Sequence, residues 1–145
     1  MERRETGRSA HSEAVPLAQA VLEACEHRDT ASLSAALDSL GIDGGLLGIA
    51  SPVPGTRCVG IAFTVQYEPV DASAVFKGAA YYIDHVPAGA VFVSSNTGRQ
   101  FCTVWGDIMT PFALATGIKG TVLDGLARDI DTVIECRYPL FSRGR

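Results

Sequence analysis

Two residue pairs in the C-terminal half of the chain combine the groups that bind small anions and divalent cations. Gly106-Asp107 comes first, and Arg128-Asp129 follows, with twenty residues between Asp107 and Arg128. A guanidinium can hold a carboxylate or phosphate through two parallel hydrogen bonds. An aspartate oxygen is a hard ligand that suits Mg²⁺ or Mn²⁺, with waters in the remaining positions. These residue types predict a small anion held beside a divalent cation, provided the two pairs meet in space.

The residues between the pairs predict a path that brings them together. Pro111 to Thr116 form an apolar helical run, Gly117 ends it, and Thr121 to Leu123 form a short apolar strand. A chain that leaves along a helix and returns along a strand places both polar ends at one edge of a sheet. We expect Asp107 or Thr110 to cap the helix, whose first N–H groups suit a carboxylate or phosphate. From the motif alone, a helix cap plus an Arg–Asp surface pair remains an alternative.

Two amphipathic helices are predicted near the N-terminus. Residues 1–13 are polar and aperiodic, which is typical of a flexible tail. Apolar residues at helical spacing predict a first helix over Pro16–His27. Asp29 or Thr30 is expected to cap a second helix, which ends at Gly41. We expect the apolar faces of both helices to lie in the core.

Strands are predicted after these helices. The glycine-rich run Gly41–Gly48 lacks the Gly-Lys-Ser/Thr ending of a phosphate-binding loop, so it predicts a turn leading into a strand. Strict alternation over Val59–Tyr67 predicts a strand with one buried face, and Ala90–Ser94 predicts a buried strand. In the partly helical segment Asp71–Asp84, the Tyr81-Tyr82 pair could form an aromatic shelf for a substrate, although packing in the core is favoured. Two helices followed by strands that alternate with helical crossovers predict an α/β or mixed α+β domain.

Composition excludes several classes of protein. The 145 residues predict one domain, and a net charge of −4 without a clustered basic patch argues against nucleic-acid binding. The four cysteines are widely spaced with no CxxC pattern, which favours reduced thiols over a disulfide framework or a zinc site. No apolar run reaches transmembrane length, and the first residues lack the apolar core of a signal peptide. We therefore expect a cytoplasmic protein that does not bind a membrane.

The pattern GD-x20-RD, in its surroundings TVWGD, GIKGTVLDGLARD and YPLFSRG, resembles the RraA-like family. This family includes the class II pyruvate aldolases that act on 4-hydroxy-4-methyl-2-oxoglutarate and 4-carboxy-4-hydroxy-2-oxoadipate. The upstream segments LSAALDSLGI, PGTRCVGIAFTV and YIDHVPAGAVFVSSNTGR resemble the same family in the same order. The resemblance covers roughly Thr30 to Gly144. It implies a single-domain swivelling α/β/α sandwich over residues 14–145, with the C-terminal part of the family fold missing.

The resemblance also implies an activity and a set of site residues. The implied activity is a metal-dependent lyase that cleaves a C–C bond of short 2-oxo acids to give pyruvate. Carried over by position, Arg128 would orient the 2-oxo acid, Asp129 would bind Mg²⁺ or Mn²⁺, and Asp107 would assist catalysis through water. The substrate carboxylate would be held by the backbone at Gly106, Ile108 and Met109. The family usually forms a trimer or a pair of trimers, with the pyruvate site between subunits.

Two departures from the family pattern bear on this expectation. Ala35 stands where aldolase members commonly carry an acidic residue that assists a neighbouring subunit's site, and the chain stops at Arg145, before a region expected to carry another acid. Aldol cleavage needs a base for the C4 hydroxyl, whereas decarboxylation of oxaloacetate needs only stabilisation of the enolate. We therefore expect decarboxylation to outlast a loss of aldolase activity. Two alternatives remain: a non-catalytic regulator, because RraA itself masks an RNA-processing nuclease, and a truncated copy that folds only with partners.

Overall fold

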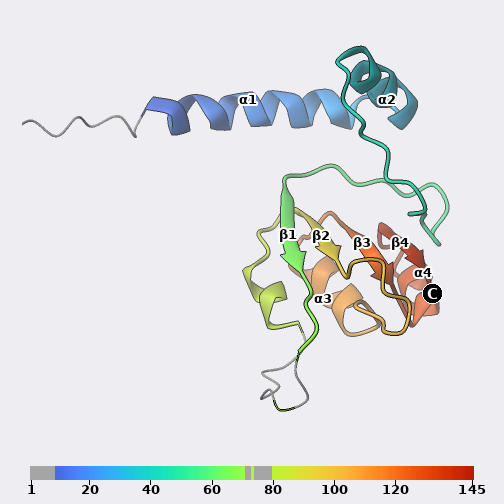
Figure 1. Ribbon diagram of the computed structural model, residues 1–145. Coiled ribbons are helices and arrows are strands. Elements are labelled where there is room, and N and C mark those ends of the chain that lie inside the picture. The colour runs from blue at the N-terminus through green and yellow to red at the C-terminus, as the bar shows by residue number, and fades with distance from the viewer. Residues whose placement is uncertain (1–8, 71–72, 74–79) are drawn as a thin grey trace, which may run out of the picture. The chain divides into compact units, whose positions relative to one another are not determined.

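The computed structural model describes residues 9–70, 73 and 80–145, and among these the side chains from residue 18 onward. The chain divides into two compact units, Met1–Gly45 and Leu46–Arg145, each of which is described here by itself. Figure 1 shows that the first unit is helical and that all four strands lie in the second. Among the described residues, no helix combines the length and the hydropathy needed to cross a membrane.

The first unit consists of helices α1 (Ser9–Glu26) and α2 (Thr30–Ser39). The predicted cap of α2 is confirmed, because the Asp29 carboxylate accepts a hydrogen bond of 2.7 Å from the Ser32 N–H. Gly41 follows α2 with a φ of 69°, a left-handed conformation that suits glycine.

Two predictions for this unit are wrong. Helix α1 begins at Ser9 rather than Pro16, so residues 9–13 are helical and not part of a tail; the tail predicted over residues 1–8 lies outside the described residues. The prediction of core-facing helices is also not met within this unit by itself, since α2 has no buried residue. Two helices alone are too small to enclose an apolar face.

The second unit is built on a four-stranded parallel sheet in the order β1-β2-β3-β4. The strands are β1 (Ala62–Gln66), β2 (Val91–Ser95), β3 (Gly120–Leu126) and β4 (Leu140–Gly144). The connections carry the 3₁₀ helix η1 (Tyr81–His85), helix α3 (Met109–Ala115) and helix α4 (Ile130–Glu135). Parallel strands joined by helical crossovers confirm the predicted α/β class.

Strand β1 is shorter and more exposed than the sequence predicted for Val59–Tyr67. Ile61 is 56% exposed, and Phe63 and Val65 are only half-buried. The reason is topological, because β1 is an edge strand that pairs with β2 alone. The strand expected after Gly41–Gly48 is reduced to one antiparallel bridge between Ala50 and Ser142.

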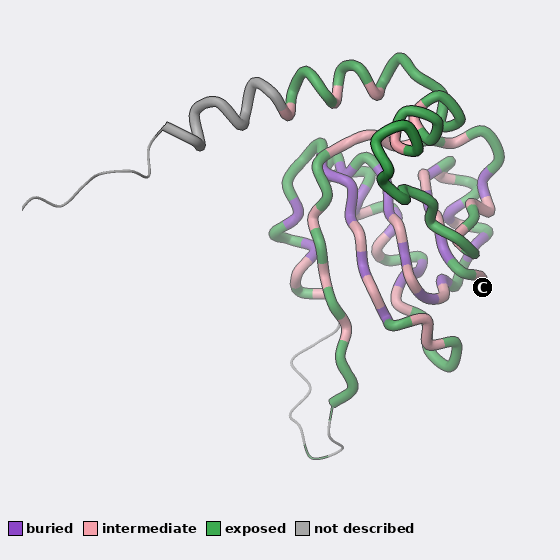
Figure 2. The backbone as a smooth tube through the Cα atoms, turned by 45° about the horizontal axis from the view of Figure 1, so that its top comes forward, coloured by how far each residue is buried: buried purple, intermediate pink, exposed green. Residues whose placement is uncertain are grey.

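The core lies on one face of the sheet. Phe92, Leu123 and Leu140 project from β2, β3 and β4, are fully buried, and belong to the same cluster as Ala113 of α3 and Val133 of α4. In Figure 2, the buried residues are concentrated along these strands. Helices α3 and α4 therefore cover this face and fix the loops that join them to the strands.

A row of aromatic rings runs through this core. Centroid distances are 5.9 Å from Tyr67 to Tyr82, 5.3 Å from Tyr82 to Phe92, 5.4 Å from Phe92 to Trp105 and 5.9 Å from Trp105 to Tyr138. The favoured prediction that the tyrosines of 71–84 pack in the core holds for Tyr82.

The neighbouring tyrosine behaves differently. The Tyr81 side chain is 70% exposed, so only one member of the Tyr81-Tyr82 pair packs inward. The rest of the excursion predicted over Asp71–Asp84 falls mainly on residues 71–72 and 74–79, which lie outside the described residues.

The burial of Tyr138, at one end of the aromatic row, leads to a prediction about the stability of the protein at alkaline pH. Burial raises the pKa of the Tyr138 phenol above its ordinary value of 10.0, and the phenol shares a hydrogen bond of 2.9 Å with the Thr121 hydroxyl. A raised folded pKa contributes stability that is complete below about pH 10 and is lost as the pH rises further. We expect Tyr138→Phe to lower the free energy of unfolding by about 1 kcal/mol at neutral pH. Above about pH 10, its stability should fall less steeply with pH than that of the wild type.

Urea denaturation of both proteins across this pH range measures the difference. Equal slopes above pH 10 would show that Tyr138 titrates normally in the folded protein and would contradict this account.

Candidate functional site

The carboxyl ends of β2 and β3 bring the two predicted residue pairs together. Beyond β2, the segment Thr103–Trp105 runs beside Leu126–Arg128. Thr103 forms a parallel bridge with Leu126. The Val104 N–H donates to the Leu126 carbonyl (3.0 Å), and the Arg128 N–H donates to the Trp105 carbonyl (2.9 Å). These backbone bonds hold Gly106 beside Arg128. The meeting of the two pairs that the sequence predicted is therefore present.

Side chains of the second pair contact the backbone of the first. The Asp107 N–H donates to Asp129 Oδ2 (3.3 Å), and Arg128 Nε lies 3.2 Å from the same oxygen. A Cβ added to Gly106 would lie 2.7 Å from this oxygen and 3.2 Å from Arg128 Nε. A side chain at position 106 would therefore push the Asp129 carboxylate and the Arg128 side chain aside.

The backbone at Asp129 is unusual for a residue with a side chain. Its φ of 54° and ψ of 42° place it in the left-handed region, directly before α4. Aspartate and asparagine tolerate this conformation better than most residues. The local geometry turns the chain sharply from β3 into α4 and leaves the Asp129 carboxylate beside Asp107.

The start of α3 differs from the prediction. Neither Asp107 nor Thr110 caps the helix; Ile108 precedes it with a helical backbone and no side-chain hydrogen bond to the helix. Thr110 lies inside the helix instead, where its hydroxyl donates to the Gly106 carbonyl (3.0 Å) and accepts from Trp105 Nε1 (3.0 Å). A threonine within a helix commonly bonds back to the carbonyl four residues earlier. Here that bond fixes Gly106 against the buried indole.

The charged groups of the site remain accessible. The side chains of Arg128 and Asp129 are 65% and 40% exposed, so their ion pair is screened by water and contributes little to stability. Within the described part of the chain, no group of three or more His, Cys, Asp or Glu residues gathers to hold a metal ion. The exposed carboxylate of Asp129 nevertheless fits Mg²⁺, which needs only one or two carboxylates and keeps several waters.

A cleft of about 730 Å³ opens beside these residues. One wall contains Gly106, Asp107, Ile108, Met109 and Arg128, which are five of the six predicted site residues. The sixth, Asp129, does not line the cleft, but its carboxylate accepts the Asp107 N–H at the cleft wall. Clefts of this size are typical of small-molecule sites.

Sequence reasoning assigned no role to several other residues that line this cleft. Among them are Tyr67, Asn96 and Cys102. Tyr81 and Tyr82, which the sequence analysis considered as an aromatic shelf, line the cleft as well. Asn96 is 4% exposed, and its Nδ2 donates to Cys102 Sγ (3.3 Å). Asn96 directly follows β2. The expectation that polar residues after neighbouring strands gather at one edge of the sheet could therefore have identified it from the sequence.

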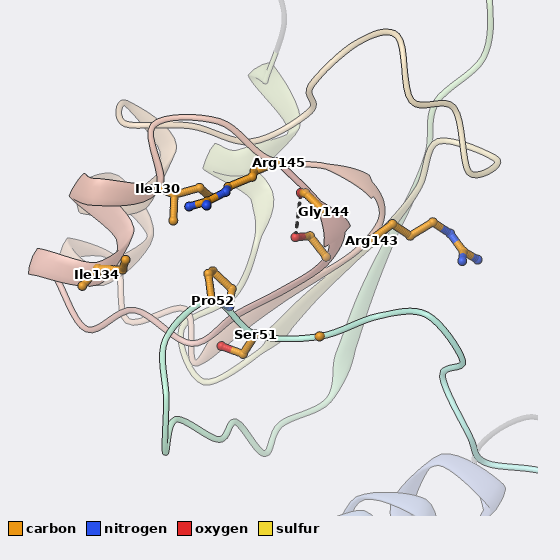
Figure 3. Close-up of a pocket in the computed structure, with 9 residues that line it drawn as sticks. Ser51, Pro52, Ile130, Ile134, Arg143, Gly144 and Arg145 are labelled. Atoms are coloured by element: carbon orange, nitrogen blue, oxygen red, sulfur yellow. Dashed lines mark hydrogen bonds between the residues drawn. The ribbon is translucent and has the colours of Figure 1, made fainter.

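A second, smaller pocket of about 350 Å³ lies between β4, α4 and the segment around Pro52. In Figure 3 the Arg145 side chain extends toward Ile130, whereas the Arg143 side chain points away from the pocket. Arg143 instead pairs with the Asp124 carboxylate, which keeps the pKa of that carboxyl below its usual range. The described lining residues include no carboxylate, histidine or cysteine, so this pocket lacks groups for acid–base or metal chemistry.

The four cysteines all lie within the described residues, and no disulfide joins them. This agrees with the prediction of reduced thiols.

Comparison with known proteins identifies relatives of both sequence and structure. Protein DlpA from Legionella pneumophila is 44% identical over 117 residues, which cover 80% of this chain and 19% of DlpA. A putative 4-hydroxy-4-methyl-2-oxoglutarate aldolase from Halalkalibacterium halodurans is 36% identical over 88 residues, covering 61% of this chain and 40% of that protein.

Two solved structures share the fold. An uncharacterized protein from Pseudomonas syringae pv. tomato is 78% identical with a TM-score of 0.80, covering 88% of this chain and 57% of that one. Streptomyces coelicolor RraAS2, described as an unusual member of the RNase ES inhibitor RraA protein family, is 27% identical with a TM-score of 0.75, covering 85% and 62%.

The chain thus spans less than two thirds of the length of each of these relatives. A sequence profile of the RraA-like family, described as Aldolase/RraA, matches residues 30–145 and so includes both residue pairs of the site. The protein belongs to the RraA-like family.

Proposed function

We propose that this protein is a divalent-metal-dependent lyase that cleaves a C–C bond of short 2-oxo acids to give pyruvate. The reaction would be aldol cleavage of a 4-hydroxy-2-oxo acid such as 4-hydroxy-4-methyl-2-oxoglutarate, decarboxylation of oxaloacetate, or both. One observation carries the proposal: Gly106-Asp107 and Arg128-Asp129 meet at the wall of a cleft that is large enough for such a substrate. The similarity to a putative 4-hydroxy-4-methyl-2-oxoglutarate aldolase supports it.

Each residue of the meeting point has a proposed role. The Arg128 guanidinium orients the 2-oxo acid and stabilises the negative charge that develops on the 2-oxo oxygen as the bond breaks. The first N–H groups of α3, at Ile108 and Met109, have no acceptor within the helix and bind the substrate carboxylate next to Gly106. Asp129 is the metal ligand, and Asp107 holds a water. A divalent cation, Mg²⁺ or Mn²⁺, would supply Lewis-acid polarisation of the substrate carbonyl when bound.

The base for aldol cleavage is the part of the mechanism with least support among the described residues. Ala35 of α2 offers no carboxylate where aldolases of the family commonly have one. Decarboxylation of oxaloacetate requires no base, so it is the reaction that these residues support best.

We also propose that the protein forms a homotrimer or hexamer in the cytoplasm, with the site completed between subunits. The exposed apolar side chain of Ile108 at the cleft, 78% exposed, favours association with another copy.

A second candidate function is a non-catalytic regulator that binds an RNA-processing nuclease. The match to RraAS2, described as a member of the RNase ES inhibitor family, favours it. The groups at 128 and 129 favour the lyase, because they lie at a cleft of the size typical of small-molecule sites.

The first prediction concerns release of pyruvate from oxaloacetate. We expect Mg²⁺-dependent release above the enzyme-free rate, a loss of about 10²-fold in Arg128→Ala because the developing charge loses its main donor, and a comparable loss in Asp129→Asn. Asparagine keeps the left-handed backbone at 129, so that variant removes the charge with little strain. A coupled assay for pyruvate, with and without EDTA, measures these rates.

Lys119→Ala and Asp131→Asn are matched controls, since both residues are exposed and neither lines the cleft. We expect wild-type rates from both. If pyruvate release does not depend on metal and Arg128→Ala does not change its rate, the lyase proposal is refuted and the regulator is favoured.

The second prediction uses the close approach at Gly106. An added Cβ would displace the Asp129 carboxylate, so we expect Gly106→Ala to weaken Mn²⁺ binding by about tenfold or more. Electron paramagnetic resonance of free Mn²⁺ measures the affinity.

Lys119→Ala is the control, because Lys119 is exposed and does not line the cleft. If Gly106→Ala binds Mn²⁺ as tightly as the wild type, Asp129 is not the ligand that we propose.

A further inference from the structure

A chain of hydrogen bonds runs from the buried indole of Trp105 to the carboxylate of Asp129. Trp105 Nε1 donates to the Thr110 hydroxyl (3.0 Å), which in turn donates to the Gly106 carbonyl (3.0 Å). The Asp107 N–H belongs to the same peptide unit as this carbonyl and donates to Asp129 Oδ2 (3.3 Å). Two side chains in the core are thus linked to the residue that we propose as the metal ligand.

The direction of the bonds at Thr110 follows from the chemistry of the groups involved. An indole N–H can only donate and a carbonyl can only accept, so the single hydroxyl proton of Thr110 must point at the Gly106 carbonyl. Thr110 is 0% exposed and Trp105 is 2% exposed, so bulk water does not compete for either side chain. The Thr110 hydroxyl is therefore occupied within the protein and does not contact a ligand.

Thr110 fixes the peptide unit between Gly106 and Asp107. The Gly106 carbonyl accepts from the Thr110 hydroxyl and also from the Thr110 N–H (3.2 Å). Because this trans peptide unit is planar, a fixed carbonyl also fixes the direction of the Asp107 N–H on the opposite side. A donor to the carbonyl also polarises the peptide unit, which strengthens the hydrogen bond that its N–H donates.

The two carboxylate oxygens of Asp129 have different surroundings. Oδ2 accepts the Asp107 N–H and lies 3.2 Å from Arg128 Nε, whereas Oδ1 has no hydrogen bond to any described residue. The side chain is 40% exposed, so burial alone does not fix its direction. A hydrogen bond that holds one oxygen orients the carboxylate and leaves the other oxygen available to a cation.

We propose that Thr110 is a positioning residue: through the Gly106–Asp107 peptide unit, its hydroxyl orients the Asp129 carboxylate so that the free oxygen can bind a divalent cation. The Trp105 indole supports this role, since its N–H holds the hydroxyl oxygen in place. The inference rests on the proposed function, because it takes Asp129 as the metal ligand. It goes further by giving a role to a buried side chain that touches neither substrate nor metal.

The affinity for Mn²⁺, measured by electron paramagnetic resonance of the free ion, tests the proposal. Thr110→Val keeps the shape of the side chain and removes the hydroxyl. We expect it to weaken Mn²⁺ binding by about tenfold, the lower end of what outer hydrogen-bond partners of metal ligands contribute. Thr110→Ser keeps the hydroxyl and should restore the wild-type affinity.

Two further variants control for packing and stability. Thr110→Val leaves the buried Trp105 N–H without an acceptor, which lowers stability, whereas the double variant Trp105→Phe/Thr110→Val removes that donor as well. We expect the double variant to bind Mn²⁺ as weakly as Thr110→Val. Thr116→Val is the matched control, because the Thr116 hydroxyl also bonds to the carbonyl four residues earlier (2.9 Å, to Phe112) but does so at the other end of α3. It should bind Mn²⁺ like the wild type.

A second measurement follows the other end of the chain of bonds. The protein has a single tryptophan, so its indole N–H gives one signal in the NMR spectrum. We expect Mg²⁺ to shift this signal in the wild type and in Thr110→Ser, but not in Thr110→Val or Asp129→Asn. A Thr110 that only stabilises the fold would change the free energy of unfolding without changing the Mn²⁺ affinity or this response.

The outcomes separate this inference from the proposed function. If the folded double variant binds Mn²⁺ as tightly as the wild type, or if Mg²⁺ does not shift the wild-type indole signal, while Asp129→Asn loses Mn²⁺ binding, the inference is overturned and the lyase proposal stands. If Asp129→Asn binds Mn²⁺ as tightly as the wild type and the wild type does not cleave oxaloacetate, the lyase proposal fails and the inference fails with it.

Discussion

The geometry of the candidate site depends on a short run of backbone hydrogen bonds just beyond the sheet. Segment Thr103–Trp105 lies alongside Leu126–Arg128, held by the Val104 and Arg128 N–H groups. The ion pair between Arg128 and Asp129 is too weak to hold these segments together, because both side chains are exposed and water screens their attraction. Backbone bonds therefore fix the positions, and the charged side chains remain available to a ligand.

Two local requirements follow from that close approach, and both are visible in residue type. Glycine at position 106 leaves room for the Asp129 carboxylate, since a Cβ there would lie 2.7 Å from it. Position 129 adopts a left-handed backbone, which favours Asp, Asn or Gly. Of these three, only Asp brings a negative charge. The residue types of the Gly-Asp and Arg-Asp pairs thus suit the backbone geometry of the site as well as its proposed chemistry.

The sequence was sufficient to predict this meeting because adjacent parallel strands end at a common edge, so polar residues after β2 and β3 must be neighbours. It was insufficient for the start of α1, which begins at Ser9 rather than Pro16, because residues 9–13 carry no apolar periodicity that would indicate a helix. It also missed the hydrogen bond between Tyr67 and Tyr82. That contact depends on how an edge strand and a 3₁₀ helix come together in space, which no local pattern encodes. The predicted cap of α3 was wrong for a related reason, since Thr110 lies inside the helix and its oxygen accepts from Trp105 Nε1 instead of from a helix N–H.

Two parts of the cleft are connected through the core. Trp105 provides the carbonyl that accepts the Arg128 N–H, and its ring packs on Phe92, which in turn stacks on Tyr82. The aromatic row therefore links the backbone that positions Arg128 to the side chains of Tyr67 and Tyr82 in the same cleft. Because protein interiors are close-packed, a change of ring size at Phe92 would shift the Trp105 segment and Tyr82 together. The core thus ties the position of the charged residues of the site to that of the tyrosines, so neither part of the cleft can be altered through Phe92 alone.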